Sequence, residues 1–136
     1  MSLYSPSVLV VDDSMLNRLL VAATLRREGY RILEATDGGS GLEAIAREHP
    51  DLVILDLQMP EMDGAEMMRR LRERSGASAP RVLLMTAMDE TESAAKAREI
   101  GADAHLVKPF APLELRARVK ELLTAAELQP RAGGNA

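Results

Sequence analysis

The sequence predicts an α/β domain in which a parallel β-sheet carries helices on both faces. The first indication is a set of short apolar runs: Val8–Val11, Leu52–Leu55, Val82–Met85 and Leu106–Val107, with a weaker run from Ile32 to Ala35. Continuous apolar runs of this length are typical of strands that are buried on both faces. Segments with helical spacing separate the runs, so strand and helix alternate five times. Such alternation requires right-handed crossovers and a parallel sheet.

Apolar residues three and four positions apart mark the intervening helices, and stripes of this kind normally face the core. The stripes are Leu16, Leu19, Leu20 and Ala23; Leu42, Ile45 and Ala46; and Leu115, Val119, Leu122, Leu123 and Ala126. A further helix is expected over residues 90–100. It carries alanine where the others carry leucine or methionine, so we expect it to be weakly packed and mobile.

Residue types suited to helix ends mark several boundaries. Capping boxes are predicted at Asp63 with Glu66 and at Asp89 with Glu92. Pro112 suits the first turn of a helix. Gly29 and Gly101 follow helical segments where a left-handed cap is expected.

Composition narrows the class of protein. A chain of 136 residues is one domain, with 46% hydrophobic and only 2% aromatic residues, so its core must be aliphatic. The formal charge of -4 argues against direct nucleic-acid or anionic-membrane binding. The absence of cysteine excludes disulfides and thiolate chemistry. With no membrane-length apolar run and no signal pattern, we expect a cytoplasmic protein that makes no membrane contact.

Five polar groups interrupt the apolar pattern at the ends of predicted strands. They are Asp12 and Asp13 after the first strand, Asp56 at the end of the third, Thr86 at the end of the fourth, and Lys108 after the fifth. The carboxyl ends of parallel strands share one edge of the sheet, where ligands bind near the topological switch point. We therefore expect the five groups to converge.

Such a cluster suits metal-assisted phosphoryl transfer. Three neighbouring carboxylates repel one another, and a divalent cation together with Lys108 would balance their charge. Oxygen ligands with open positions favour Mg²⁺. A carboxylate beside the metal can attack a phosphoryl donor and form an acyl phosphate, whose oxygens the metal, Lys108 and Thr86 would hold. Asp56 is the expected nucleophile because it ends a central strand.

The segments that carry these groups resemble the signature set of response-regulator receiver domains. They are 8–14 (VLVVDDS), 56–64 (DLQMPEMDG), Thr86-Ala87 and Lys108-Pro109-Phe110. The resemblance implies a flavodoxin-like, doubly wound sheet of five parallel strands in the order 2-1-3-4-5, with five helices. Residues 7–125 would form the receiver domain, 1–6 an N-terminal extension, and 126–136 the end of the last helix and a tail or linker stub.

The resemblance also implies a role for each site residue. Asp56 becomes the phosphoacceptor, and Mg²⁺, for which Mn²⁺ can substitute, is assigned to Asp12 or Asp13, Asp56 and the backbone carbonyl of Gln58. Contact with the phosphate and switching are assigned to Thr86, Ala87, Lys108 and His105. Further expectations are a cis bond before Pro109 and tuning of the phosphoryl lifetime by Gln58 and Met88. His105 stands where tyrosine or phenylalanine is commoner in the family, and we expect it to rotate inward on activation.

The implied partners are a sensor histidine kinase or phosphotransfer protein as donor, with a small acyl phosphate as an alternative, and a downstream effector domain or protein. The output face would comprise the fourth helix, fifth strand and fifth helix, and a homodimer through that face is a further expectation. The chain would be a regulatory phosphoacceptor, not an enzyme, catalysing only its own phosphorylation and dephosphorylation.

Three alternatives fit the residues less well. A haloacid-dehalogenase-type phosphatase needs a second aspartate where this chain has Gln58, and it needs room for a substrate-selecting cap. A dinucleotide-binding module needs a glycine-rich turn after the first strand, where this chain has Asp12, Asp13 and Ser14. A degenerate receiver would lack part of the acidic set, Thr86 or Lys108, all of which are present.

Overall fold

The computed structural model describes residues 5–76 and 79–128 of the chain. Five strands alternate with five helices, namely β1 (Ser7–Val11), α1 (Met15–Arg26), β2 (Arg31–Ala35), α2 (Gly38–Glu48), β3 (Leu52–Asp56), α3 (Gly64–Ser75), β4 (Arg81–Thr86), α4 (Glu90–Ile100), β5 (Ala104–Val107) and α5 (Pro112–Leu128). Two parts of the predicted segments lie outside the described residues: 1–4 of the N-terminal extension, and 129–136 of the helix end and tail expected over 126–136.

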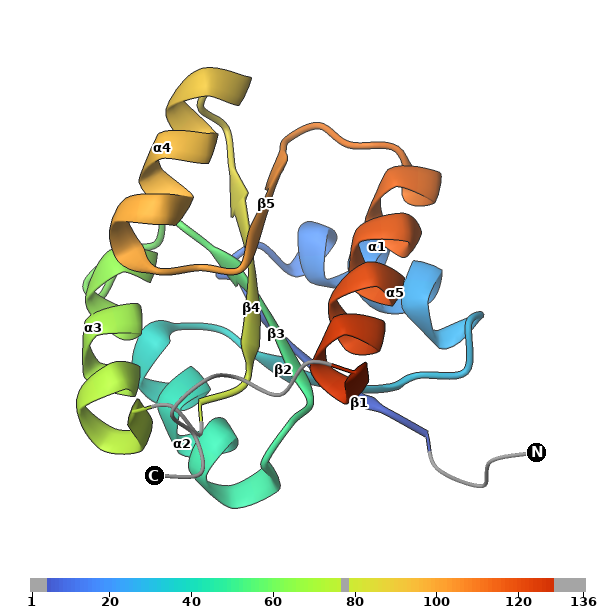
Figure 1. Cartoon of the computed structure of the whole chain (residues 1–136), viewed down its shortest axis with the longest axis horizontal. Coiled ribbons are helices and arrows are strands. Elements are labelled where there is room, and N and C mark those ends of the chain that lie inside the picture. The colour runs from blue at the N-terminus through green and yellow to red at the C-terminus, as the bar shows by residue number, and fades with distance from the viewer. Residues whose placement is uncertain (1–4, 77–78, 129–136) are drawn as a thin grey trace.

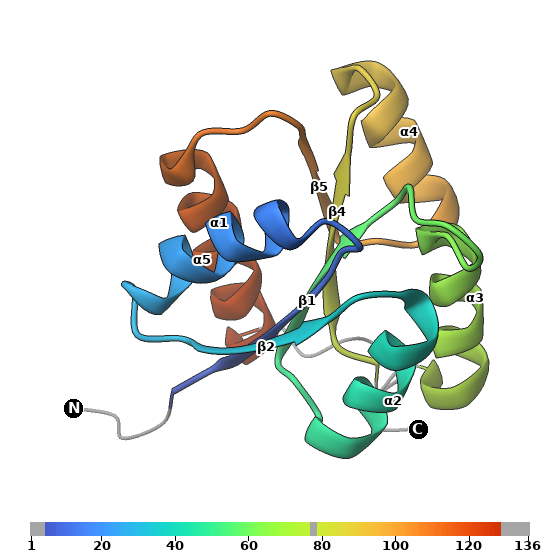
Figure 2. The ribbon, with the colours of Figure 1, turned by 180° about the vertical axis from the view of Figure 1, so that it is seen from behind.

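The strands form one parallel sheet in the order β2-β1-β3-β4-β5, which confirms the expected topology. Helices α1 and α5 cover one face, and α2, α3 and α4 cover the other (Figures 1 and 2). The chain runs from β1 outward to β2 and then returns to place β3 on the other side of β1. The connections after β1 and β3 therefore diverge at the carboxyl edge, which is where such folds place their ligand sites.

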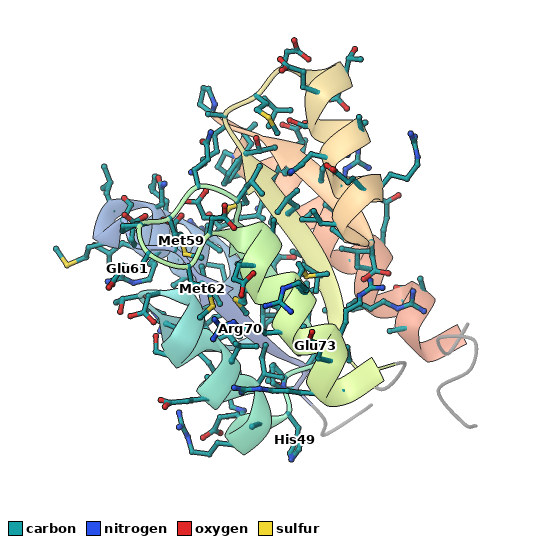
Figure 3. The ribbon with its side chains drawn as sticks, turned by 90° about the vertical axis from the view of Figure 1, so that its left-hand side faces the viewer. His49, Met59, Glu61, Met62, Arg70 and Glu73 are labelled. Atoms are coloured by element: carbon teal, nitrogen blue, oxygen red, sulfur yellow. The ribbon has the colours of Figure 1, made fainter. Side chains whose placement is uncertain are left out.

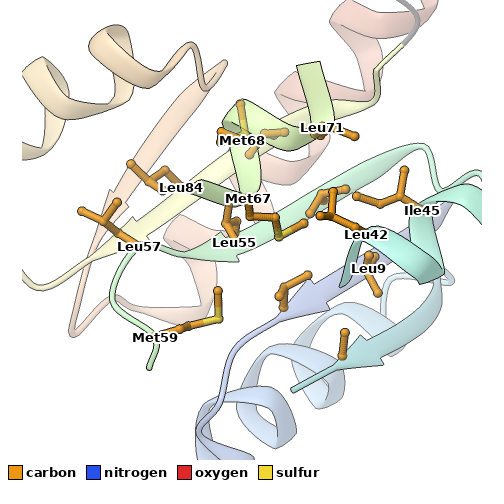
Figure 4. Close-up of a cluster of buried hydrophobic side chains, with 14 of the residues drawn as sticks. Leu9, Leu42, Ile45, Leu55, Leu57, Met59, Met67, Met68, Leu71 and Leu84 are labelled. Atoms are coloured by element: carbon orange, nitrogen blue, oxygen red, sulfur yellow. The ribbon is translucent and has the colours of Figure 1, made fainter. Parts of the chain in front are cut away.

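The three central strands β1, β3 and β4 are buried on both faces of the sheet, which explains their continuous apolar runs, whereas the edge strand β2 carries Arg31 and Glu34 and is partly exposed. On the face covered by α2, α3 and α4, the strand residues Leu9, Leu55 and Leu84 pack in one cluster with Met67 and Leu71 of α3 (Figure 4). On the opposite face the buried cluster comprises Val8, Val10, Val21, Leu25, Leu52, Ile54, Leu83, Met85, Leu106, Leu115, Val119 and Leu122. Adjacent strand residues thus enter different clusters, as the period of two requires.

The orientation expected for α1 is wrong, although the helix itself is present. Leu16, Leu19 and Leu20 are 66%, 53% and 58% exposed. The buried residues of the helix are instead Val21, Ala22 and Leu25. The exposed leucines and the buried residues both have helical spacing, so α1 is apolar on two sides. Periodicity alone therefore could not show which side faces the core.

Helix ends largely follow the expected signals. Asp63 and Asp89 are N-caps, accepting hydrogen bonds from backbone N–H groups three residues on at 3.0 and 2.8 Å. Helix α5 begins at Pro112, and Gly101 caps α4 at φ +82°. The sequence reading missed the capping box of α2, which Asp37 forms with Ser40. None of the described helices is long and apolar enough to span a bilayer.

Candidate functional site

Three carboxylates meet at the carboxyl edge of the sheet, where β1 and β3 lie side by side. Asp12, Asp13 and Asp56 each place a carboxylate oxygen within 4.8 Å of the other two. Asp12 is fully buried, Asp56 is 3% exposed, and Asp13 is exposed to solvent. Burying the negative charges of Asp12 and Asp56 next to each other costs free energy unless positive charge or hydrogen-bond donors offset it.

Compensation by the protein itself is incomplete. Lys108 Nζ lies 3.2 Å from Asp56 Oδ1, and the backbone N–H of Gln58 donates to the same oxygen at 3.2 Å. Asp12 Oδ1 accepts from the N–H of Ser14 at 2.9 Å. Asp12 Oδ2 is buried, and no donor among the described residues reaches it. A buried carboxylate oxygen without a partner in a cluster of three acids is the position that a cation would satisfy.

The electrostatics of Asp56 lead to the same conclusion. Burial raises the pKa of the Asp56 carboxyl, and the neighbouring Asp12 raises it further, while Lys108 and the N–H of Gln58 act in the opposite direction. Ionised Asp56 is therefore less favourable in the folded protein than in water. An oxygen-rich, negatively charged site of this kind fits Mg²⁺, which prefers carboxylate and carbonyl oxygens.

The ends of β4 and β5 bring the remaining polar groups to this edge. The backbone N–H of Lys108 donates to the carbonyl of Thr86 at 2.8 Å, and the Lys108–Pro109 peptide bond is cis. Thr86 is fully buried, and its hydroxyl oxygen accepts from the N–H of Met88 at 2.9 Å. Ala87 is exposed at the start of the turn. The Thr86 hydroxyl thus stabilises the turn after β4. Among the residues that the structure describes, it forms no hydrogen bond with Asp56.

His105 lies on β5 and interacts with α4, not with the acidic cluster. Its side chain is 21% exposed, and Nε2 lies 2.5 Å from Oε1 of Glu90, the first residue of α4. The sequence reading missed Glu90, because nothing in a one-dimensional pattern links the start of a helix to the following strand. Of the two residues expected to tune lifetime, Gln58 is exposed, whereas Met88 is partly buried against the apolar cluster.

A close backbone approach positions the loop that follows Asp56. A Cβ built on Gly64 would lie 2.9 Å from the Cα of Leu57 and 3.0 Å from the carbonyl oxygen of Asp56. The N–H of Gly64 donates to the Leu57 carbonyl at 2.8 Å. Only glycine allows α3 to begin this close to the end of β3. The loop between them carries Met59, Glu61 and Met62, and Glu61 adopts φ +66° (Figure 3).

The raised pKa of Asp56 gives a testable consequence for stability. We predict that, without divalent metal, Asp56→Asn unfolds at a higher urea concentration than the wild type at pH 7. A carboxyl with a raised folded-state pKa favours folding below its unfolded pKa and loses that contribution as pH rises through the folded value. The amide avoids this loss, so the difference between the two proteins should disappear below the ordinary value of 3.8.

The control for this measurement is Asp13→Asn, which removes an exposed carboxylate of the same cluster and should shift the urea midpoint less. A lower midpoint for Asp56→Asn at pH 7 would contradict the prediction, because it would mean that the ion pair with Lys108 outweighs burial and repulsion.

Comparison with known proteins agrees with the resemblance to response-regulator receiver domains. Residues 8–120 match the response regulator receiver domain family. The chain is 39% identical over 121 residues to the alkaline phosphatase synthesis transcriptional regulatory protein PhoP of Bacillus subtilis, covering 89% of this chain but 50% of that protein. It is 37% identical over 116 residues to sporulation initiation phosphotransferase F of the same organism, covering 85% of this chain and 92% of that protein.

Among solved structures, chemotaxis response regulator CheY4 of Vibrio cholerae superposes with a TM-score of 0.81 at 32% identity, covering 88% of this chain and 99% of that one. The CheY-like receiver domain protein of Methanospirillum hungatei gives 0.83 at 27% identity, covering 93% and 99%. The chain spans about half the length of PhoP and of the similar transcriptional regulators. Sequence, fold and acidic site agree, and the chain belongs to the response regulator receiver domain family, the regulatory phosphoacceptor domains of two-component systems.

Proposed function

We propose that the chain is a signalling switch that accepts a phosphoryl group on Asp56 in the presence of Mg²⁺. The observation that carries the proposal is a cluster of three carboxylates whose negative charge is only partly offset. Lys108 contacts Asp56, but a buried oxygen of Asp12 has no hydrogen-bond donor among the described residues. A site that only stabilised the fold would gain little from this arrangement, because ionising Asp56 is unfavourable there.

The chemical step needs no general base, because ionised Asp56 is already a nucleophile. Both described hydrogen bonds to Asp56 use Oδ1, so we assign the attack to Oδ2. A new O–P bond forms, and the bond from phosphorus to the imidazole nitrogen or acyl oxygen of the donor breaks, with its electron pair leaving on that atom. Lys108 would then pair with the phosphoryl oxygens, and Thr86 would contribute its hydroxyl.

The cation would be held by the side chains of Asp12, Asp13 and Asp56 and by the carbonyl of Gln58, and Mn²⁺ would substitute for Mg²⁺. When bound, it supplies positive charge that offsets the negative charge of the carboxylates and of the incoming phosphoryl group. Gln58 follows Asp56 by two residues and is exposed, and Met88 follows Thr86 by two residues and is partly buried. They would adjust the access of water to the acyl phosphate and hence its lifetime.

Phosphorylation would be transmitted through Thr86 and His105. A phosphoryl group on Asp56 would offer an acceptor to the O–H of Thr86, whose oxygen at present accepts from the N–H of Met88. His105 would move inward as Thr86 leaves, ending its contact with Glu90 at the start of α4. The face formed by α4, β5 and α5 would then change and be recognised by an effector domain, an effector protein or a second copy.

The donor we propose is a phosphohistidine on a sensor kinase or phosphotransfer protein, and the surface beside the site fits a protein donor. In the described part of the chain, the exposed large apolar side chains belong to α1 and the first turn of α5, and these two helices are neighbours (Figure 2). We call Met15, Leu16, Leu19, Leu20 and Leu113 the α1–α5 apolar patch. Helix α1 starts directly after the acidic pair, so a protein that reaches Asp56 would cover this patch.

The proposal is tested by the intact mass of the chain after incubation with acetyl phosphate and Mg²⁺. We expect one added phosphoryl group in the wild type, and none in Asp56→Asn or in the wild type without Mg²⁺. Labelling of Asp56→Asn to the same extent would move the phosphoacceptor elsewhere. No addition to a wild type that binds Mg²⁺ would show that acetyl phosphate cannot serve as donor.

The role of the α1–α5 apolar patch is tested by Leu16→Gln. Losing one such apolar contact costs about 1.5 kcal/mol, so we expect transfer from a phosphorylated histidine kinase to slow about tenfold. Labelling by acetyl phosphate should not change, because a small donor needs no docking surface. Ala46→Gln, at an exposed position of α2 on the other face of the sheet, is the matched control. Equal slowing with both donors would contradict docking at this patch.

The contact between His105 and Glu90 is tested by Glu90→Gln, with Glu99→Gln at the other end of α4 as control. An exposed pair of this kind contributes up to about 1 kcal/mol, so its loss should raise the rate of labelling by acetyl phosphate up to about fivefold. The ring signals of His105 should also move when fluoroberyllate, a phosphoryl mimic, is added. Unchanged ring signals would rule out His105 as part of the switch.

A further inference from the structure

Arg18 connects the acidic site to the rest of the fold, although it is no member of the cluster. It lies on α1, and its side chain is only 13% exposed. One guanidinium nitrogen, Nη1, donates to the backbone carbonyl of Asp12 at 2.8 Å, and Nε donates to Glu34 Oε1 on β2 at 3.1 Å. Arg18 therefore joins the carboxyl end of β1 to its neighbour strand through two bonds in a fixed fork geometry.

These bonds complete the constraint on Asp12. Its backbone N–H donates to the carbonyl of Ala35 at 3.1 Å, and its Oδ1 accepts from the N–H of Ser14 at 2.9 Å. With Arg18 on the carbonyl, three of the four polar atoms of the residue have protein partners. The fourth, Oδ2, is the buried oxygen that no described donor reaches. Asp12 is thus held so that this one oxygen stays available.

We propose that Arg18 is a positioning residue for the cation site, acting through the backbone of Asp12. By fixing the Asp12 carbonyl, it would hold the Asp12 carboxylate, with its buried and unpartnered Oδ2, in place before any metal binds. The inference rests on the proposed Mg²⁺-dependent function and adds a residue that neither binds the metal nor contacts the phosphoryl group.

Charge and position predict opposite effects of removing Arg18, which makes the inference testable. A guanidinium near the site repels a cation, and Glu34 offsets that repulsion in part. If charge were the main contribution, a neutral residue would tighten Mg²⁺ binding. If positioning is the main contribution, the neutral residue loosens Asp12 and weakens binding. Partners that orient metal ligands are typically worth about 10- to 100-fold in metal affinity.

The experiment is a calorimetric Mg²⁺ titration of the full chain carrying Arg18→Met, Arg18→Lys or Arg26→Met. Arg26 is the matched control, because it lies on the same helix, 3.8 Å from the same Glu34, and is 56% exposed. We expect Arg18→Met to weaken Mg²⁺ binding about tenfold, and Arg26→Met to stay within about twofold of the wild type. Arg18→Lys keeps the charge but not the fork, so its affinity should fall in between.

A urea titration of the metal-free variants separates this role from a purely structural one. Arg18→Met with a lower urea midpoint but wild-type Mg²⁺ affinity would overturn the inference, as would tighter Mg²⁺ binding. If Arg18→Met does not fold, Arg18→Lys decides, and wild-type affinity in that variant would equally overturn it. A wild type that binds no Mg²⁺ would instead refute the proposed function, so the two failures are distinguishable.

Discussion

The repulsion between Asp12 and Asp56, both buried at the ends of adjacent strands, is the constraint on which the site depends. The parallel sheet creates it, because β1 and β3 end at the same edge. Lys108, which follows β5, partly offsets this repulsion through its contact with Asp56. Gly64 allows α3 to begin directly against the end of β3. The negative charge of the cluster is not fully compensated, so the site favours the binding of additional positive charge, which the proposed phosphoryl transfer to Asp56 would need.

Much of the fold and the acidic cluster could be predicted because both follow from one-dimensional rules. A run such as Val8–Val11 identifies a strand buried on both faces, and the polar residue after each run, such as Asp56, then belongs to the carboxyl edge. The orientation of α1 could not be predicted, because Leu16 lies on one of two apolar sides. Glu90 and Arg18 were also missed, since their partners on neighbouring strands are set by tertiary packing, which periodicity does not encode.

Helix α4 is weakly packed against the sheet but is held by polar contacts at both of its ends. It buries two small side chains, so little apolar area holds it to the sheet. Its ends are fixed by polar contacts instead: Glu90 meets His105 at the start, and Arg72 of α3 donates to the carbonyl of Gly101 at the end. Loss of one anchor would leave the helix held at its other end, so the surface that it forms could shift without unfolding.

The α1–α5 apolar patch would also determine the lifetime of a complex formed there. Five large apolar side chains remain in water in the free protein, and covering one fully contributes about 1.5–3 kcal/mol. Association itself costs roughly 4–15 kcal/mol in lost freedom of motion. The five side chains are already partly covered, and the gain from covering them further is similar in size to this cost, so a partner held by the patch alone would bind weakly and leave quickly. If a kinase docks there as proposed, rapid departure would let one kinase molecule serve many copies of the chain in succession.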